Sequence, residues 1–231
     1  MNNSKPVLYH CWSDTNSQRL RLALSYKQIS YTDKPISRWD DEIFFELGVS
    51  LVFPILQMPD KSLLLNVNEI LWEIDGIFPS DRMLVRNVID EAAWNSLLEW
   101  REKVDAILTR LTAPALLNYI DIAESDDRVA AYKRHVQNAY NMSAEALAND
   151  RYAAYTQFAQ LTNIVALGKH LTAKQFYMGA PSIADAVLTA DLYPLQCLDG
   201  VSLPIDILYY LSRVEKEFDL DLQQGFKTKL N

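Results

Sequence analysis

The hydrophobic pattern of the first part of the chain changes between a strand-like and a helix-like period. Residues 6–12 form a short apolar run rich in strand formers, and residues 29–36 alternate apolar and polar positions, which is typical of a strand. Between them Leu20, Ala23 and Leu24 lie at positions i, i+3 and i+4, the spacing of one helix face. The pattern therefore predicts a β-α-β unit.

A second group of short elements follows this unit. A short acidic and apolar helix is expected at residues 40–47. Residues 52–58 and 63–65 predict a β-hairpin, because Pro59 and the aspartate after it suit the middle of a turn. Pro54 lies inside the first of these strands, where a proline is tolerated at an edge, at a bulge or as a cis peptide.

The last element of the first part is a helix that begins at Asn66. Glu69 lies three residues further on, the spacing of an N-cap and its reciprocal partner, and an apolar face follows. Residues 1–78 therefore predict the order β-α-β-α-β-β-α. Residues 76–81, which contain a glycine and a proline, are expected to form a linker.

The remaining residues, 79–231, give almost only helical signals. A long amphipathic run begins at Trp94 and is expected to end or kink at Pro114. Another helix is expected to begin at Ser182, an N-cap with Asp185 three residues further on. The other helices are predicted at residues 128–149, 152–170 and 204–218.

Composition agrees with a helical protein that has a core. Hydrophobic residues make up 49% and charged residues 23%, so wholesale disorder is excluded. Glycine occurs only 6 times in 231 residues, which argues against many short strands joined by tight turns.

Net charge and the lack of targeting signals limit which partners and which cellular compartment are expected. The net charge is −8, from 22 basic and 30 acidic residues, so neither nucleic acid nor an anionic membrane is expected as a partner. No apolar stretch is long enough to span a bilayer, and no secretory signal precedes residue 12. Two cysteines, Cys11 and Cys197, cannot form a disulfide framework. We expect a cytoplasmic protein.

Metal and nucleotide sites are not indicated. The three histidines are scattered without an HxxH or HExxH spacing, so no metal is expected. Neither a GxxxxGK nor a GxGxxG motif occurs, so no nucleotide-binding loop is expected.

Three local segments resemble the cytosolic glutathione transferase superfamily. The opening at residues 5–36 is similar to that of zeta-class enzymes. Residues 53–56 (Phe-Pro-Ile-Leu) resemble the Val-Pro-x-Leu motif of the family, whose proline is cis. Residues 176–185 resemble its F-x-x-G…S-x-A-D signature at a buried helix start. The resemblance implies an α/β thioredoxin-like domain, residues 1–78, and an all-α C-terminal domain, residues 79–231.

The resemblance also implies where glutathione binds. The tripeptide would pair with the backbone at Phe53 and Pro54. Its γ-glutamyl carboxylate would lie at the start of the third helix, where the family usually carries Glu-Ser or Gln-Ser. Asn66 and Val67 occupy these positions, so the hydroxyl is missing. The glutathione site of this chain therefore departs from the pattern of the family.

In relatives of this kind a hydroxyl or a cysteine at the start of the first helix faces the glutathione sulfur. The candidates here are Thr15 and Ser13, either of which would stabilise a thiolate, while Thr15 as a simple helix cap stays open. Asp14 stands where a serine is usual and has the wrong charge for that role, so it is expected to cap the helix. Cys11 comes about three positions early and is expected to be packed.

Two functions follow from the resemblance. The first is a glutathione transferase-like enzyme that uses glutathione as co-substrate to conjugate or isomerise a small apolar electrophile, and that forms a homodimer as members of the family do. The alternative is a non-catalytic protein of the same fold that acts through protein–protein interaction, like stringent starvation protein A. The departed glutathione site favours the second, and the zeta-like opening favours the first. Glutaredoxin-like thiol exchange is disfavoured because residues 14–17 contain no cysteine.

Overall fold

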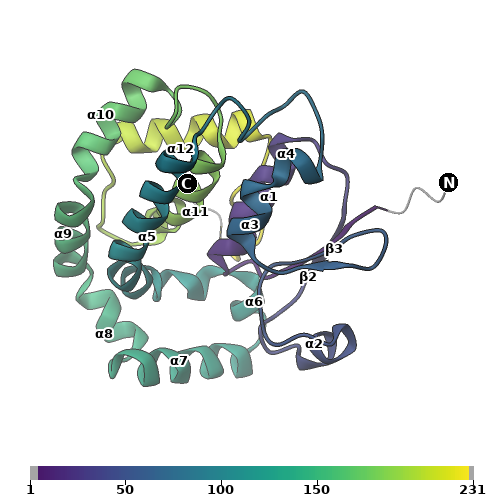
Figure 1. The fold of residues 1–231 in the computed structure, drawn as a ribbon. Coiled ribbons are helices and arrows are strands. Elements are labelled where there is room, and N and C mark those ends of the chain that lie inside the picture. The colour runs from purple at the N-terminus through teal and green to yellow at the C-terminus, as the bar shows by residue number, and fades with distance from the viewer. Residues whose placement is uncertain (1–4, 229–231) are drawn as a thin grey trace.

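A computed structural model describes residues 5–228 as a small sheet beside a larger helical part (Figure 1). The strands are β1 (Val7–His10), β2 (Thr32–Pro35), β3 (Ile55–Gln57) and β4 (Leu63–Leu64). Their order is β2-β1-β3-β4; β1 and β2 are parallel, and the other neighbours are antiparallel. This is the mixed sheet of a thioredoxin-like domain, as the sequence predicts.

Alternation along the strands divides the sheet into two apolar faces. Leu8 of β1 and Leu56 of β3 belong to the main core, which also holds the apolar residues of the first and third helices. Tyr9 and Ile55 point to the opposite face, where Phe44 of the second helix covers them. The sheet is therefore covered on both faces. Tyr9 packs in the strand and is only 6% exposed.

Four helices belong to the part of the chain that carries the sheet. They are α1 (Thr15–Tyr26), α2 (Asp41–Leu47), α3 (Val67–Trp72) and α4 (Ile74–Ile77). Two details differ from the sequence prediction. Pro54 precedes β3 instead of lying inside it, because a cis peptide joins Phe53 to Pro54. The expected third helix is interrupted at Glu73, so it forms α3 and α4.

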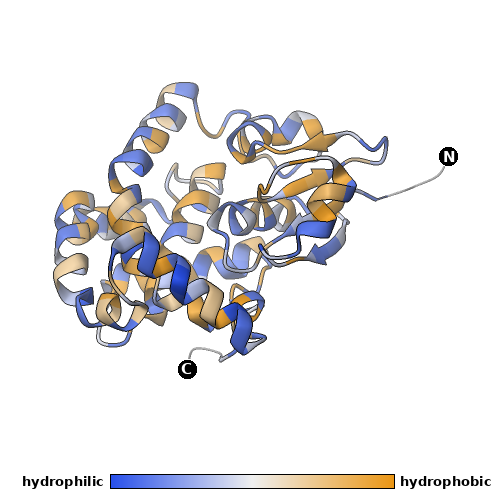
Figure 2. Ribbon diagram, turned by 90° about the horizontal axis from the view of Figure 1, so that it is seen from below, coloured by the Kyte–Doolittle hydropathy of each residue, from blue (hydrophilic) through white to orange (hydrophobic). Residues whose placement is uncertain are grey.

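The helical part begins with the long helix α5 (Glu91–Thr112), which ends before Pro114 as predicted. The remaining elements are η1 (Ala115–Asn118), α6 (Ile120–Ala123), α7 (Asp126–Tyr140), α8 (Ala144–Asn149), α9 (Arg151–Thr162), α10 (Ile164–Lys174), α11 (Ile183–Leu192), η2 (Tyr193–Cys197) and α12 (Ile205–Phe218). Figure 2 shows hydrophobic segments gathered around the sheet and the inner helices, whereas the outer helices carry more hydrophilic turns.

Two predicted helices are each divided by an asparagine. The helix expected at residues 128–149 is α7 and α8, because Asn141 adopts a left-handed conformation with φ 53° and Ser143 caps a new helix. The helix expected at residues 152–170 is α9 and α10, which meet at Asn163 with φ 48°. Asparagine tolerates this conformation better than most residues, so it ends one helix and lets the next change direction.

Helix α11 lies at the centre of the helical part, and every one of its residues is buried. Its start is the predicted one: Ser182 and Asp185 form a capping box, and Tyr210 of α12 donates a 2.9 Å hydrogen bond to Asp185. Helix α1 packs along α11, and Arg19 of α1 forms a 2.8 Å ion pair with Asp191 of α11. This packing fixes the first turn of α1 against the helical part. No helix within residues 5–228 is long and apolar enough to cross a membrane.

Candidate functional site

Strand register gathers three of the predicted site segments at one end of the sheet. Tyr9 lies opposite Ile55, so the residues after β1, which lead into α1, run beside the Phe53–Pro54 peptide. Leu56 lies opposite Leu64, so the start of α3 reaches the same end. The starts of α1 and α3 and the cis peptide therefore share one edge of the fold.

The Phe53–Pro54 peptide is cis, as the resemblance implies. Pro54 is buried, and the ring of Phe53 packs edge-to-face on Phe44 of α2 with centroids 5.3 Å apart. Within residues 5–228 no hydrogen bond engages the backbone of Phe53. Its amide and carbonyl are therefore available to an extended peptide ligand.

The start of α3 offers a backbone terminus and no hydroxyl. Asn66 is the N-cap, as predicted, and its Oδ1 accepts from the amides of Asn68 and Glu69. Its Nδ2 also donates to Glu69 Oε1 over 2.7 Å, so Glu69 bonds the cap side chain instead of the cap amide. Val67 is buried in the main core and turns no polar group to the surface.

Asp14 caps α1, as predicted. Its Oδ2 accepts a 2.6 Å hydrogen bond from the Ser17 amide, and α1 begins at Thr15. Burial raises the pKa of the Asp14 carboxyl, although the hydrogen bonds from Ser17 oppose the rise. Since Asp14 is the cap, the Thr15 hydroxyl is not needed to cap the helix. The Ser17 hydroxyl accepts a 3.2 Å hydrogen bond from the amide of Cys11, the residue that follows β1.

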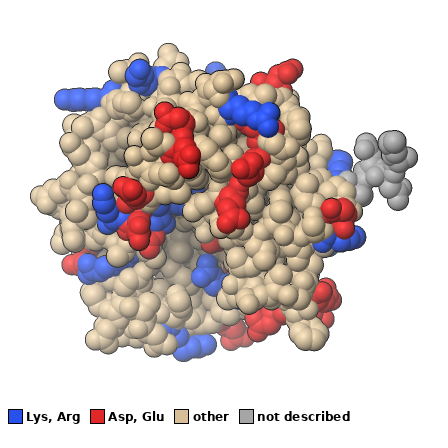
Figure 3. Space-filling view, viewed as in Figure 1, with Lys and Arg blue, Asp and Glu red and all other residues tan. Residues whose placement is uncertain are grey.

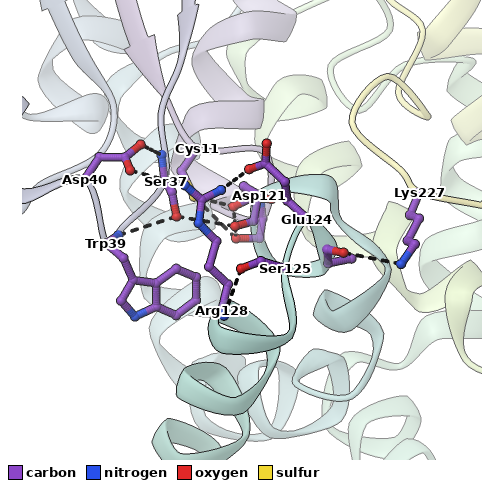
Figure 4. A network of polar contacts seen from close by, with 11 residues as sticks. Cys11, Ser37, Trp39, Asp40, Asp121, Glu124, Ser125, Arg128 and Lys227 are labelled. Atoms are coloured by element: carbon purple, nitrogen blue, oxygen red, sulfur yellow. Dashed lines mark hydrogen bonds and ion pairs between the residues drawn. The ribbon is translucent and has the colours of Figure 1, made fainter.

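Cys11 and Ser13 share one acceptor from a distant part of the chain. The Cys11 thiol donates to Asp121 Oδ2 over 2.7 Å, and the Ser13 hydroxyl donates to the same oxygen over 2.6 Å. Figure 4 shows Cys11 and Asp121 directed toward one another, with Ser37 beside them. The Ser37 hydroxyl donates to the Asp121 carbonyl over 3.3 Å. Helix α6 is thus fixed to the segment that joins β1 to α1.

This arrangement separates the two predicted hydroxyl donors. Ser13 is 5% exposed, and its hydroxyl donates its hydrogen bond to the Asp121 carboxylate. Burial, together with the negative charge of Asp121, raises the pKa of Cys11 to about 12, so its thiol stays protonated at neutral pH. Cys11 is packed, as expected. Thr15 is the candidate whose hydroxyl no other group within residues 5–228 engages.

Thr15 opens onto a cavity of about 240 Å³ between the start of α1 and the helical part. The wall opposite Thr15 comes from α5 and α7 and includes Leu108, Thr109, Tyr132 and Tyr140. Two aromatic side chains of α7 therefore line this cavity. Figure 3 shows a hollow on this face of the molecule, with both basic and acidic side chains around it.

Two arginines also line this cavity, and the sequence did not mark either of them. Arg101 of α5 forms ion pairs with Asp105 and, over 2.9 Å, with Asp191. Arg38 comes from the segment between β2 and α2. Asp121 was missed too, because nothing near it in the sequence indicates that it reaches Cys11. Among residues 5–228 no group of three or more His, Cys, Asp or Glu is placed to hold a metal ion.

Comparisons with known proteins agree with this architecture. No family model matches the chain, and no curated protein matches it in sequence. Among solved structures, glutaredoxin 2 from Salmonella typhimurium in complex with glutathione has a TM-score of 0.77 at 17% identity, over 96% of this chain and 98% of that chain. A glutathione S-transferase of Ceriporiopsis subvermispora in complex with glutathione has a TM-score of 0.70 at 14% identity, over 99% and 100%.

A third structure extends the range of activities. Maleylacetoacetate isomerase from Anaeromyxobacter dehalogenans, with dicarboxyethyl glutathione and citrate in its active site, has a TM-score of 0.53 at 19% identity, over 95% and 91%. At these identities the likeness establishes the fold. The chain has the glutathione transferase fold, a thioredoxin-like part followed by a helical part, as the sequence predicts.

Proposed function

We propose that this protein is a glutathione-dependent enzyme that conjugates or isomerises a small electrophile. The observation that carries the proposal is the place of Thr15. Its hydroxyl lies at the start of α1, lines a cavity closed by α5 and α7, and has no partner within residues 5–228. In this proposal residues 1–78 bind glutathione, and residues 79–231 supply the wall for the electrophile.

The chemistry needs a thiolate. The glutathione thiol, with an ordinary pKa near ~8.5, loses its proton to solvent, and the Thr15 hydroxyl donates a hydrogen bond to the sulfur. The free amides at the start of α1 add a favourable dipole. The thiolate then forms a C–S bond. In conjugation a leaving group departs with the electron pair of its bond. In isomerisation the new C–S bond breaks again and returns the thiolate, so neither reaction requires an oxidant.

Glutathione would be held mainly by backbone groups. The free amide and carbonyl of Phe53, presented by cis-Pro54, pair with the cysteinyl unit. The start of α3 attracts the γ-glutamyl carboxylate through its amides, with no hydroxyl at Val67. A missing hydrogen bond to a charged group costs about 1.5–3 kcal/mol, so we propose affinity about 10- to 100-fold below that of a complete site. On this ground we propose that the glutathione site departs from the pattern of the family.

Thermal unfolding with glutathione tests the proposal. Ligand at 100 times its Kd stabilises the folded state by about 2.7 kcal/mol, so about 10 mM glutathione is expected to raise the Tm. The same preparation is expected to conjugate 1-chloro-2,4-dinitrobenzene faster than the uncatalysed reaction. Absence of both effects would refute the proposal.

A second candidate is the non-catalytic interaction protein. Two observations favour it: the carboxylate of Asp14 lines the same cavity as Thr15, where it would oppose a thiolate, and Phe45 and Leu51 are apolar yet 88% and 60% exposed. Under this candidate glutathione does not raise the Tm, and the protein does not conjugate 1-chloro-2,4-dinitrobenzene. Phe45→Glu abolishes binding of a defined protein partner. We also propose a homodimer with α5 (Glu91–Thr112) in its interface. Sedimentation of the wild-type protein, which gives the mass of one chain or of two, tests it.

A further inference from the structure

Arg38 has no ion-pair partner among residues 5–228. It is half-buried between β2 and α2, and its guanidinium lines the cavity that holds Thr15. Its Nε atom is buried and has no hydrogen-bond partner. Within residues 5–228 the side chain forms no hydrogen bond and no ion pair. A guanidinium in this position normally has a carboxylate or carbonyl partner.

The second arginine of the cavity shows the contrast. Arg101 is neutralised by Asp105 and by Asp191, and Asp191 also receives Arg19 over 2.8 Å. These groups form a closed network on one wall. Arg38 is thus the arginine of the cavity whose charge remains available within the described chain.

Asp14 also lines the cavity, and one of its carboxylate oxygens is already engaged. Its Oδ2 accepts from the Ser17 amide over 2.6 Å, and no ion pair within 4.0 Å joins it to Arg38. Arg38 does act on both sides of the cavity: its charge lowers the pKa of Asp14 and of Tyr132, each against a larger rise caused by burial. The guanidinium therefore lies between the start of α1 and α7.

Beyond the two arginines, the wall mixes apolar residues with polar ones such as Thr109, Thr112 and His135. Leu108 and Val136 contribute apolar surface. The Tyr132 hydroxyl donates a 2.8 Å hydrogen bond to the Ala113 carbonyl. Asp14 would repel a second negative charge beside Thr15. A carboxylate would therefore bind at Arg38, with the reactive carbon directed toward Thr15.

We propose that Arg38 binds a carboxylate of the electrophile, so that the cavity takes a small anionic electrophile and not the apolar one expected from the sequence. The inference rests on the proposed function. A guanidinium binds a carboxylate through two parallel N–H donors, which fixes its orientation as well as its position. Arg38 is therefore the specificity-determining residue of the electrophile pocket.

A matched pair of substrates tests this assignment. 4-Chloro-3-nitrobenzoate and 4-chloro-3-nitrobenzamide differ in one charge; with each, a C–S bond replaces the C–Cl bond, chloride leaves, and the thiol proton goes to solvent. Wild type is expected to prefer the benzoate. Arg38→Gln is expected to lower kcat/KM for the benzoate by about 10- to 100-fold, chiefly through KM, and to change the benzamide less than about twofold. The KM for glutathione is expected to stay unchanged.

Arg134→Gln is the matched control, because Arg134 is exposed on α7 outside the cavity lining and the substitution removes the same charge. It is expected to leave both substrates unaffected. Equal losses for both substrates, or no loss at all, would overturn the inference. A raised KM for glutathione in Arg38→Gln would also overturn it, because Arg38 would then bind a carboxylate of the tripeptide.

Calorimetric binding of 4-nitrobenzoate and 4-nitrobenzamide separates this inference from the proposed function. Wild type is expected to bind the benzoate more tightly, and Arg38→Gln is expected to lose that preference. If neither substrate is turned over but the preference is present, the proposed function fails and the carboxylate site stands. If turnover is present without any preference for the benzoate, the carboxylate site fails and the proposed function stands.

Discussion

The thiol of Cys11 donates a hydrogen bond to the carboxylate of Asp121 over 2.7 Å, although the two residues are 110 positions apart. Burial and the Asp121 charge raise the Cys11 pKa to about 12. We predict that iodoacetamide at pH 8 labels Cys11 in the denatured chain but not in the native protein, which peptide mass spectrometry measures. Stoichiometric labelling of native Cys11 under these conditions would contradict the arrangement.

The raised pKa also predicts a loss of stability in alkali. The folded chain keeps the Cys11 proton when the unfolded chain has lost it, so stability falls as pH rises from 9.0 toward about 12. One such group changes the free energy of unfolding by at most about 1.4 kcal/mol per pH unit. Urea unfolding at several pH values is expected to give a shallower slope for Cys11→Ala than for wild type.

Cys197 provides the comparison, because burial also raises its pKa to about 12. Cys197→Ala is expected to reduce the alkaline slope independently, and the double variant to reduce it further. If Cys11→Ala retained the full wild-type slope, the buried and hydrogen-bonded thiol would not be the titrating group.

Features set by neighbouring residues could be predicted from the sequence. Asp14 caps α1 through Ser17, and Ser182 pairs with Asp185, because each contact spans three positions. The cis peptide at Pro54 followed from a short motif of a known family.

Features set by tertiary packing could not be predicted. Asp121 reaches Cys11 only because the fold brings α6 to the segment after β1, and Arg38 shares a cavity with residues of α7, about 100 positions further along the chain. The helices that break at an asparagine could be predicted only in part, since their presence follows from the sequence pattern but their division does not. Hydrophobic periodicity continued past Asn141 and Asn163, and the left-handed backbone at each asparagine ended the helix nonetheless.

Thr15 is predicted to act on the glutathione sulfur. Thr15→Val removes the donor, keeps the volume and leaves the helix cap at Asp14 in place. We expect kcat/KM for conjugation to fall about 100-fold, because a donor to a developing charge is removed, with little change in Tm. Thr15→Ser is expected to restore most of the activity. Unchanged turnover in Thr15→Val would remove Thr15 from the mechanism.

Asp75 is predicted to make stability depend on acid pH. Its carboxylate accepts from Lys27 Nζ over 2.8 Å and from the amides of Leu84, Val85 and Arg86, which joins α1 and α4 to the following segment. Burial alone would raise the Asp75 pKa, but the bonds from Lys27 and the three amides outweigh it and lower the pKa. The stabilisation is therefore present above the ordinary value of 3.8 and is lost as pH falls below it.

Substitution of Asp75 tests this dependence. Asp75→Asn leaves Lys27 buried without a counter-charge and is expected to cost about 3–5 kcal/mol at pH 7. Its stability is expected to change less than that of wild type between pH 5 and 3, as measured by urea unfolding. Asp81→Asn, at an exposed position, is the control and is expected to follow wild type. An acid slope in Asp75→Asn as steep as that of wild type would assign the effect to other carboxyls.

Asp14 is predicted to oppose the proposed chemistry. Its carboxylate lines the same cavity as Thr15, and burial raises its pKa, so ionised Asp14 is destabilised in the fold above its ordinary value of 3.8. Asn caps a helix about as well as Asp, so Asp14→Asn is expected to raise stability at pH 7 and to move the acid limb of the conjugation rate to lower pH. Asp14→Ala removes the charge and the cap together, and is expected to show the same shift of the pH profile with a Tm lower than that of Asp14→Asn. A pH profile unchanged in both variants would mean that the carboxylate does not act on the glutathione sulfur.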